Sequence, residues 1–214
     1  LANLLEYRQR LLRDVSHELR SPLTRLQAAT VLSAHRKTVS EPDRERIERE
    51  IHRMDVLIGD ILRYSRLDDA AAMSRRLVRL DELLREIEQD ARIEAAGGGV
   101  RLALRCAPGL LVVGDPELLH SAFENLVRNA VRHSGAAGLV EIIATAGGEI
   151  RVEVLDTGPG VPAEYLERIF EPWFRVPRPG AATDAPAGTG LGLAIARRVF
   201  ALHGGRVVAG NRPG

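Results

Sequence analysis

The chain has 214 residues, of which 45% are hydrophobic and 28% charged, a balance that excludes a wholly disordered or fibrous protein. Its 30 basic and 29 acidic residues nearly cancel, so no overall field marks it as a nucleic-acid binder. No apolar run reaches the roughly 20 residues that span a bilayer. The single cysteine, Cys106, cannot form an internal disulfide and favours a reducing compartment such as the cytoplasm. The start at Leu1 is neither a signal peptide nor an ordinary translation start, and we expect a piece of a longer protein.

Residues 1–67 predict two long helices, because they carry almost no glycine and repeat their seam residues at heptad spacing. The seam positions are Leu5, Leu12, Leu19 and Leu26, then Ile47, Ile51, Met54, Ile58, Ile61 and Ser65. Residues 40–43, Ser-Glu-Pro-Asp, supply a cap and an early proline for restarting a helix, which indicates an αα-hairpin. A lone hairpin cannot cover both seams, so we expect two copies to pair as a four-helix bundle.

The pattern changes after residues 68–76, a polar, alanine-rich segment that we interpret as a linker. From Leu77 onward, short alternating runs follow one another between helical patterns, which predicts an α/β sandwich over 77–214. The expected strands are 100–106, 110–113, 140–144, 150–155 and 206–209, and the expected helices are 83–95, 116–132, 163–169 and 191–202. The stretch 176–190 is broken by glycine and proline, which predicts a mobile lid.

His17 is the first candidate for chemistry. It lies about 140° around its helix from Leu12 and about 200° from Leu19, so its ring faces away from the seam. Pro22 removes a backbone donor and kinks the helix beside it. Taken alone, such a histidine is more typical of a solvated helix face than of a reactive group. A zinc site is not indicated, because no second histidine follows four residues later.

Two glycine-rich segments and one helix face could bind a phosphate. Residues 156–160, Asp-Thr-Gly-Pro-Gly, follow an expected strand, and 188–193, Gly-Thr-Gly-Leu-Gly-Leu, precede an expected helix, where N–H groups and the helix dipole attract anions. The second segment lacks the Gly-Lys-Ser/Thr of a Walker A loop. Asn125, Asn129 and Arg132 share a helix face, and amide oxygens can ligate Mg²⁺ while arginine holds phosphates. Singly, each segment is also compatible with an ordinary turn or a polar helix surface.

Five segments in this order resemble the H, N, G1, F and G2 boxes of bacterial sensor histidine kinases. They are residues 17–23 (His-Glu-Leu-Arg-Ser-Pro-Leu), 124–134, 156–160, 170–175 (Phe-Glu-Pro-Trp-Phe-Arg) and 188–193. The resemblance covers nearly the whole chain, and residues 14–27 are most similar to the envelope-stress, Cpx-type sensors. It implies a helical-hairpin dimerisation and histidine phosphotransfer domain at 1–67, a linker at 68–76 and a Bergerat-type (GHKL) α/β sandwich that binds ATP at 77–214.

The resemblance also implies what single residues do. His17 resembles the phosphoacceptor, whose distal ring nitrogen attacks the γ-phosphate of ATP while Glu18 takes the proton from the other nitrogen. Ser21 holds the position where the family orients water for dephosphorylating its partner. The implied cofactors are ATP and Mg²⁺, with Asn129 as the metal ligand. The implied nucleotide-binding residues are Asn125, Asn129, Arg132, His133, Asp156, Gly158, Gly160, Phe170, Arg175, Gly188, Thr189, Gly190, Leu191 and Gly192.

Within that set, Arg132 and Arg175 resemble the cations on the phosphates. His133 resembles the ring near the adenine, and Asp156 the carboxylate that accepts a hydrogen bond from the adenine amino group.

One position separates this chain from the related gyrases, Hsp90-type chaperones and mismatch-repair ATPases. Those enzymes place a glutamate base four residues before the Mg²⁺ asparagine, whereas this chain has Asn125, and an amide cannot act as a general base. We therefore expect a homodimeric kinase that passes a phosphoryl group from His17 to an aspartate of a response-regulator receiver domain. We expect it to be the cytoplasmic part of a bacterial inner-membrane sensor that is anchored upstream of Leu1. The alternatives are a non-catalytic, nucleotide-binding dimer scaffold and a water-hydrolysing ATPase.

Overall fold

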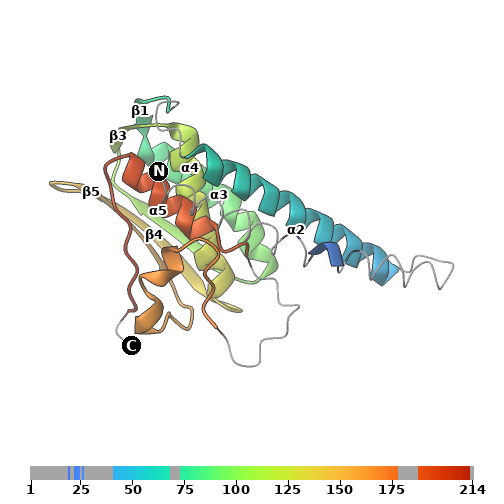
Figure 1. The fold of residues 1–214 in the computed structure, drawn as a ribbon. Helices are drawn as coiled ribbons and strands as arrows, with labels where there is room; N and C mark the ends of the chain where they lie inside the picture. Colours follow the sequence, from blue (N-terminus) through green and yellow to red (C-terminus); the bar gives the residue numbers. More distant parts are fainter. Residues whose placement is uncertain are drawn as a thin grey trace. The chain divides into compact units, whose positions relative to one another are not determined.

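The computed structural model describes residues 19, 22–24, 26, 41–67, 73–177 and 188–212, and the chain divides into two compact units, Leu1–Ser65 and Arg66–Gly214 (Figure 1). Most of the expected first helix and the turn at residues 36–40 fall outside the described residues. No helix in the described ranges is both long and apolar enough to cross a bilayer.

The main described element of the first unit is helix α2 (Glu41–Arg66), which confirms the second predicted helix. Ion pairs between successive turns stabilise it, including Arg53 with Glu50 at 2.9 Å and Arg49 with Glu45 at 3.5 Å. The heptad residues Ile51 and Ile58 are exposed on its surface. The chain by itself therefore leaves part of the predicted seam uncovered.

The second unit is an α/β sandwich, as the sequence predicts. Its main sheet has the order β2-β4-β5, with β2 (Arg101–Cys106) parallel to β4 (Leu139–Ala146), and β4 antiparallel to β5 (Ile150–Asp156). A separate antiparallel pair joins β1 (Arg76–Arg79) to β3 (Leu111–Gly114). Strand β1 begins at the last residue of the expected linker and was not predicted as a strand.

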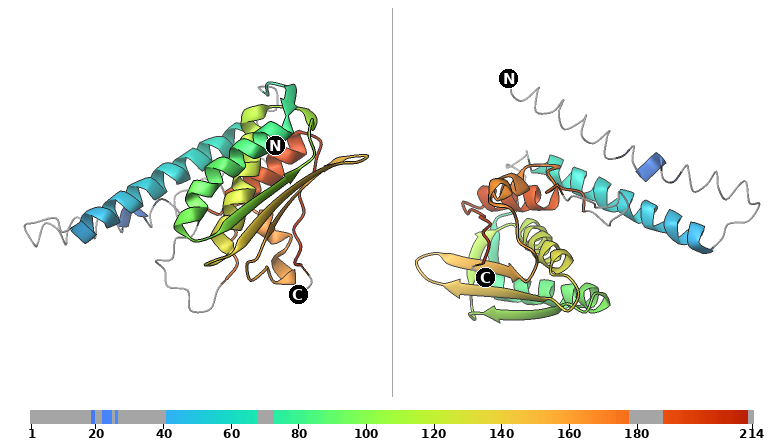
Figure 2. Two further views of the ribbon diagram at one scale, coloured as in Figure 1. Left: turned by 180° about the vertical axis from the view of Figure 1, so that it is seen from behind. Right: turned by 90° about the horizontal axis from the view of Figure 1, so that it is seen from below.

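Three helices cover one face of the main sheet (Figure 2). They are α3 (Leu80–Gly97), α4 (Pro116–His133) and α5 (Gly192–Leu202). The core between the layers includes Leu84 and Val127 from the helices and Ile142 from β4, all fully buried. Because the apolar residues of the helices face the sheet, their polar faces remain available for the site.

Helix α4 is defined at both ends by its own sequence. The carboxylate of Asp115 accepts hydrogen bonds from the N–H groups of Glu117 (3.1 Å) and Leu118 (3.2 Å), and Pro116 occupies the first turn. At the other end, the hydroxyl of Ser134 donates to the carbonyl of Ala130 at 2.8 Å. These hydrogen bonds fix the first and last turns of α4, the helix that carries Asn125, Asn129 and Arg132.

Two predicted elements are wrong. Residues 163–169 form no α-helix but two 3₁₀ turns, η2 (Ala163–Tyr165) and η3 (Arg168–Phe170), whose N–H groups bond the carbonyl three residues back. A short segment gains few hydrogen bonds against the cost of nucleating an α-helix. Residues 206–209 form no strand, since a strand needs a hydrogen-bonded neighbour and the described residues supply none. The expected lid at 176–190 falls largely on residues 178–187, outside the described ranges, and stays a prediction.

Candidate functional site

The polar face of α4 lies against the glycines that precede α5. Asn125 and Asn129 are half-buried one turn apart, above the buried Phe123 and Val127. A Cβ at Gly192 would lie 2.8 Å from Oδ1 of Asn125, so a larger residue at the start of α5 would displace this amide. The structure thereby brings together two segments that are 67 positions apart in the sequence.

Arg132 continues this contact at the end of α4. A Cβ at Gly188 would overlap Nη1 of Arg132, so the guanidinium lies directly against the backbone of the glycine loop. The loop opens onto α5, an 11-residue helix whose first N–H groups and dipole favour an anion. Arginine and a helix N-terminus converge here, which suits phosphate groups.

Within the loop, a side chain and a left-handed glycine set the backbone. The hydroxyl of Thr189 accepts a hydrogen bond from the N–H of Leu191 at 3.2 Å, and Leu191 is fully buried. Gly190 has φ +76°, a conformation that favours glycine. Its carbonyl accepts a hydrogen bond from the N–H of Trp173 at 2.9 Å, which ties the loop to the segment before residue 178.

The second glycine-rich segment is a turn at the end of β5. The N–H of Gly158 donates to Oδ1 of Asp156 at 2.8 Å, which closes an Asx turn. A Cβ at Gly158 would lie 2.6 Å from the carbonyl oxygen of His133, so the turn packs on the end of α4. Gly160 follows with φ +73°.

Arg132 and His133 therefore join the two glycine segments. These neighbouring residues contact Gly188 and Gly158 respectively. The structure thus assembles Asn125, Arg132, His133, Asp156 and both glycine segments along the second half of α4. The arrangement offers an anion-binding side at α5 and a carboxylate side at β5.

Phe170 and Arg175 are not among the residues that the glycine contacts along α4 bring together. Phe170 is buried, and the guanidinium carbon of Arg197 lies 5.9 Å from its ring centroid, so it packs toward α5. Arg175 is exposed, three residues before the segment that is not described. The nucleotide roles of both stay predictions. His17, Glu18 and Ser21 lie outside the described residues.

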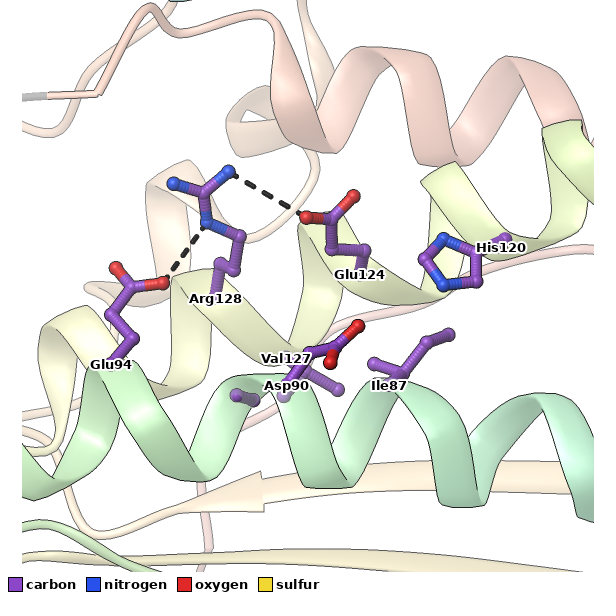
Figure 3. Close-up of a pocket in the computed structure, with 8 residues that line it drawn as sticks. Ile87, Asp90, Glu94, His120, Glu124, Val127 and Arg128 are labelled. Atoms are coloured by element: carbon purple, nitrogen blue, oxygen red, sulfur yellow. Dashed lines mark hydrogen bonds and ion pairs between the residues drawn. The ribbon is translucent and has the colours of Figure 1, made fainter.

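A groove on another face of α4 is not part of this site (Figure 3). It lies between α3 and α4, with a volume of about 260 Å³. Its lining residues are Ile87, Asp90, Ala91, Glu94, His120, Glu124, Val127 and Arg128. Arg128 closes it through ion pairs with Glu94 at 3.2 Å and Glu124 at 3.8 Å. Glu124 lies about 100° around the helix from Asn125, so the groove and the site face different directions.

The residues present fit a nucleotide and a divalent ion. A Cβ at Gly158, Gly188 or Gly192 would overlap His133, Arg132 or Asn125, so these glycines let both segments pack closely beside the polar groups of α4. No group of three or more His, Cys, Asp or Glu side chains among the described residues could hold a metal. A magnesium ion here would therefore depend on phosphate oxygens, waters and an amide oxygen such as that of Asn129.

Sequence reasoning missed two residues that shape the site. Trp173 has φ +67°, unusual for a bulky residue, and its buried Nε1 finds no hydrogen-bond partner among the described residues. Asn211, two residues after the expected strand 206–209, reaches Gly160 and Val161. Trp173 lies within the F-box resemblance but was given no role there, and no local pattern marks Asn211. Both contacts join segments that are distant in the sequence.

Two family models match the chain. Residues 7–70 match the His Kinase A (phospho-acceptor) domain, and residues 114–214 match the histidine kinase-, DNA gyrase B-, and HSP90-like ATPase. The second match includes α4, β5 and α5, which carry the assembled site. The first match includes His17 and precedes the second match in the chain.

Curated relatives match the chain across both units. The sensor histidine kinase CpxA of Escherichia coli K12 is 40% identical over 214 residues, which cover 100% of this chain and 46% of CpxA. The sensor protein PfeS of Pseudomonas aeruginosa is 37% identical over 207 residues, which cover 95% of this chain and 44% of PfeS. The chain spans about half the length of the curated relatives it matches.

Solved structures share the fold. Full-length ShkA in complex with AMPPNP is 32% identical, with a TM-score of 0.65 over 96% of this chain and 43% of ShkA. The histidine kinase ThkA in complex with the response regulator TrrA gives a TM-score of 0.79 over 99% of this chain and 60% of ThkA, at 24% identity. The isolated catalytic domain of ThkA gives 0.58 at 29% identity, over 66% of this chain and 91% of that domain.

Proposed function

Since the chain belongs to the sensor histidine kinases, of which it carries the phospho-acceptor and ATPase regions in order, we propose that it phosphorylates His17 from ATP and passes the phosphoryl group to a response regulator. The proposed acceptor is an aspartate of the regulator's receiver domain. The similarity to ShkA, solved with AMPPNP, supports an adenine nucleotide as the donor. We place this activity on the cytoplasmic side of a bacterial inner-membrane sensor.

The observation that carries the proposal is the amide of Asn125 against Gly192. This is the phosphate side of the site, where a water-hydrolysing ATPase needs a base to activate water. An amide has no proton-accepting role at neutral pH, so this position cannot direct water to the γ-phosphate. Without a base to activate water, the γ-phosphoryl group is not lost to hydrolysis and can react with another nucleophile. The phospho-acceptor region supplies His17 as that nucleophile.

The chain's own residues perform binding and charge neutralisation. Arg132, beside Gly188, and the first N–H groups of α5 hold the phosphates, while Asp156 accepts a hydrogen bond from the adenine amino group. Asn129 supplies an amide ligand to Mg²⁺, which when bound neutralises phosphate charge and helps orient the γ-phosphate.

The proposed chemistry is an in-line phosphoryl transfer. The distal ring nitrogen of His17 forms a bond to the γ-phosphorus as the bond to the bridging oxygen breaks, and ADP leaves. Glu18 accepts the proton from the other ring nitrogen, which keeps the imidazole nucleophilic. An aspartate oxygen of the regulator then attacks the same phosphorus, and the P–N bond breaks to release His17. Ser21 orients a water that dephosphorylates the phosphorylated regulator. Ser21→Ala is expected to lose this phosphatase activity.

The proposed assembly is a homodimer formed through the first unit. Ile51, Ile58 and Leu62 are exposed along α2, and a second copy of the hairpin would cover them in a four-helix bundle. The dimer supplies two copies of His17 and two ATPase units.

The experiment is incubation of the full chain with γ-labelled ATP and Mg²⁺, beside His17→Ala. Label that is acid-labile and base-stable is expected on the parent and absent from His17→Ala. The matched control is His52→Ala, which removes an exposed histidine of α2 and is expected to keep the label. Label that survives in His17→Ala would assign the acceptor elsewhere. Steady release of phosphate from ATP without labelled protein would favour the ATPase alternative.

A further inference from the structure

We propose that Asn211 is a positioning residue for adenine recognition: its side chain holds the turn from Asp156 to Val161 and thereby fixes the direction of the Asp156 carboxylate. The inference deepens the proposed function and rests on the role given there to Asp156. It concerns the specificity of the site for adenine over other bases.

Asn211 binds the backbone of Val161 twice. The N–H of Val161 donates to Oδ1 of Asn211 at 2.9 Å, and Nδ2 of Asn211 donates to the carbonyl of Val161 at 2.7 Å. A side-chain amide carries a donor and an acceptor side by side, which is what both polar groups of one peptide residue require. Asn211 thus pairs with Val161 as a neighbouring strand would, although residues 206–209 form no strand.

Gly160 makes room for this pair. Its φ of +73° lies in the left-handed region, and a Cβ there would lie 2.7 Å from Oδ1 of Asn211. Any side chain at position 160 would displace the amide as well as strain the backbone. The glycine therefore serves the contact with Asn211 in addition to the turn.

The beginning of the same turn is held from the other side. The hydroxyl of Thr157 accepts a hydrogen bond from the N–H of Leu139 at 3.0 Å, at the start of β4. Gly158 donates to Oδ1 of Asp156, which uses one of the two carboxylate oxygens. Thr157 attaches the beginning of the turn to the sheet, and Asn211 attaches its other end at Val161. The orientation of the Asp156 carboxylate therefore depends on both side chains.

A residue that only stabilises the fold would weaken binding of every nucleotide to the same degree. A residue that directs Asp156 changes the discrimination between bases, because adenine presents an amino donor to that carboxylate and guanine presents a carbonyl acceptor at the same ring position. The ratio of ADP to GDP affinity therefore separates the two roles. ADP and GDP carry identical phosphates, so the Arg132 side of the site contributes equally to both.

The test measures ADP and GDP affinity by calorimetry on the full chain with Mg²⁺, for the parent, Asn211→Ala, Asn211→Asp and Arg212→Ala. We expect ADP affinity to fall about three- to tenfold in Asn211→Ala, as for the loss of one or two exposed hydrogen bonds, with GDP affinity held within about twofold. Asn211→Asp loses the donor to the Val161 carbonyl and is expected to lower the same ratio. Arg212→Ala, which removes the adjacent ion pair with Glu141, is the matched control and keeps the parent ratio.

Amide hydrogen exchange at Val161 gives a second readout that does not depend on a nucleotide, and it should accelerate in Asn211→Ala but not in Arg212→Ala. An unchanged ADP-to-GDP ratio in the Asn211 variants, or equal losses for both nucleotides, would overturn the proposal. If Asn211→Ala does not fold, the ADP-to-GDP affinity ratio of Asn211→Asp tests the proposal in its place. A parent that shows no preference for ADP would instead remove the proposed role of Asp156, and the inference with it.

Discussion

Helices α2 and α3 have similar amphipathic sequences but expose their apolar residues to different degrees. In α3, Leu83, Leu84 and Ile87 are buried in the core of the second unit. In α2, Ile51 is 48% and Ile58 is 43% exposed. The stripe of α3 is covered within its own unit, whereas we propose that a second copy of the chain covers the exposed isoleucines of α2. Amphipathicity alone thus cannot tell a core helix from an interface helix.

Both helices carry ion pairs between successive turns, but their buried carboxylates bind different partners. Helix α2 carries a ladder of ion pairs between its turns, such as Arg44 with Glu41 and Arg63 with Asp60, which support a helix where packing is incomplete. Helix α3 has a buried carboxylate near its start, Asp81, which accepts a hydrogen bond from the N–H of Gly109 at 3.2 Å. These ion pairs of α2 stay within the helix, whereas Asp81 also joins α3 to a loop 28 residues away.

The largest expected effect comes from the core of α3. Leu84→Ala removes a fully buried side chain and leaves a cavity, so the free energy of unfolding of the second unit should fall by about 3–5 kcal/mol. Urea unfolding followed at several protein concentrations measures it, and the loss should not depend on concentration. Ile93→Ala, on the same helix but 80% exposed, is the matched control and should change stability by under about 0.5 kcal/mol. Equal losses in both variants would break the contrast between the two faces of α3.

The next effect concerns the exposed stripe of α2. Ile58→Asp places a charge in the proposed dimer interface, and self-association should weaken at least about tenfold because the charge must be desolvated there. Analytical ultracentrifugation over a concentration series measures the dissociation constant. Arg49→Ala lowers the net charge by the same amount on the opposite side of α2 and should leave self-association unchanged. A dimer that tolerates Ile58→Asp would show that another surface joins the copies.

The smallest effect is a pH dependence of the second unit. Burial opposes ionisation of Asp81, but the hydrogen bond from Gly109 and the Arg79 guanidinium outweigh it and hold the pKa of this carboxyl below its ordinary value. A lowered folded-state pKa contributes stability that is fully present above the unfolded pKa of about 3.9 and is lost as pH falls through the folded value. Thermal unfolding from pH 6 to pH 3 should show a steeper acid loss in the parent than in Asp81→Asn. Parallel curves would mean that Asp81 has no part in acid sensitivity.

Much of this molecule was predictable because its signals are local. Heptad spacing predicted α2, alternating runs predicted β2 to β5, and the helical pattern at 116–132 predicted α4. The glycines at 188 and 192 and the amide at 125 also followed from residue types and order. Each segment alone was also compatible with an ordinary turn or a polar helix surface, and only the fold shows that Asn125 and Gly192 are in contact.

The remaining features depend on contacts between distant segments. The stretch 163–169 has helical residue types, yet it is too short to form an α-helix without a buried face. Residues 206–209 alternate like a strand but have no neighbour to pair with among the described residues. Trp173 and Asn211 act through partners at positions 190 and 161, and no spacing rule connects residues so far apart.

The contact of Arg132 and His133 with the two glycine segments has a consequence for ligand choice. The end of α4 sets the separation between the anion-binding side and the carboxylate side. The proposed site therefore selects a ligand long enough to contact both. A free base or a free phosphate engages only one side and loses the gain in effective concentration that a linked ligand receives from the second contact. Fraying of the last turn of α4 would release both sides at once. The hydroxyl of Ser134, which donates to the carbonyl of Ala130 in that turn, therefore helps to hold both sides of the proposed nucleotide site.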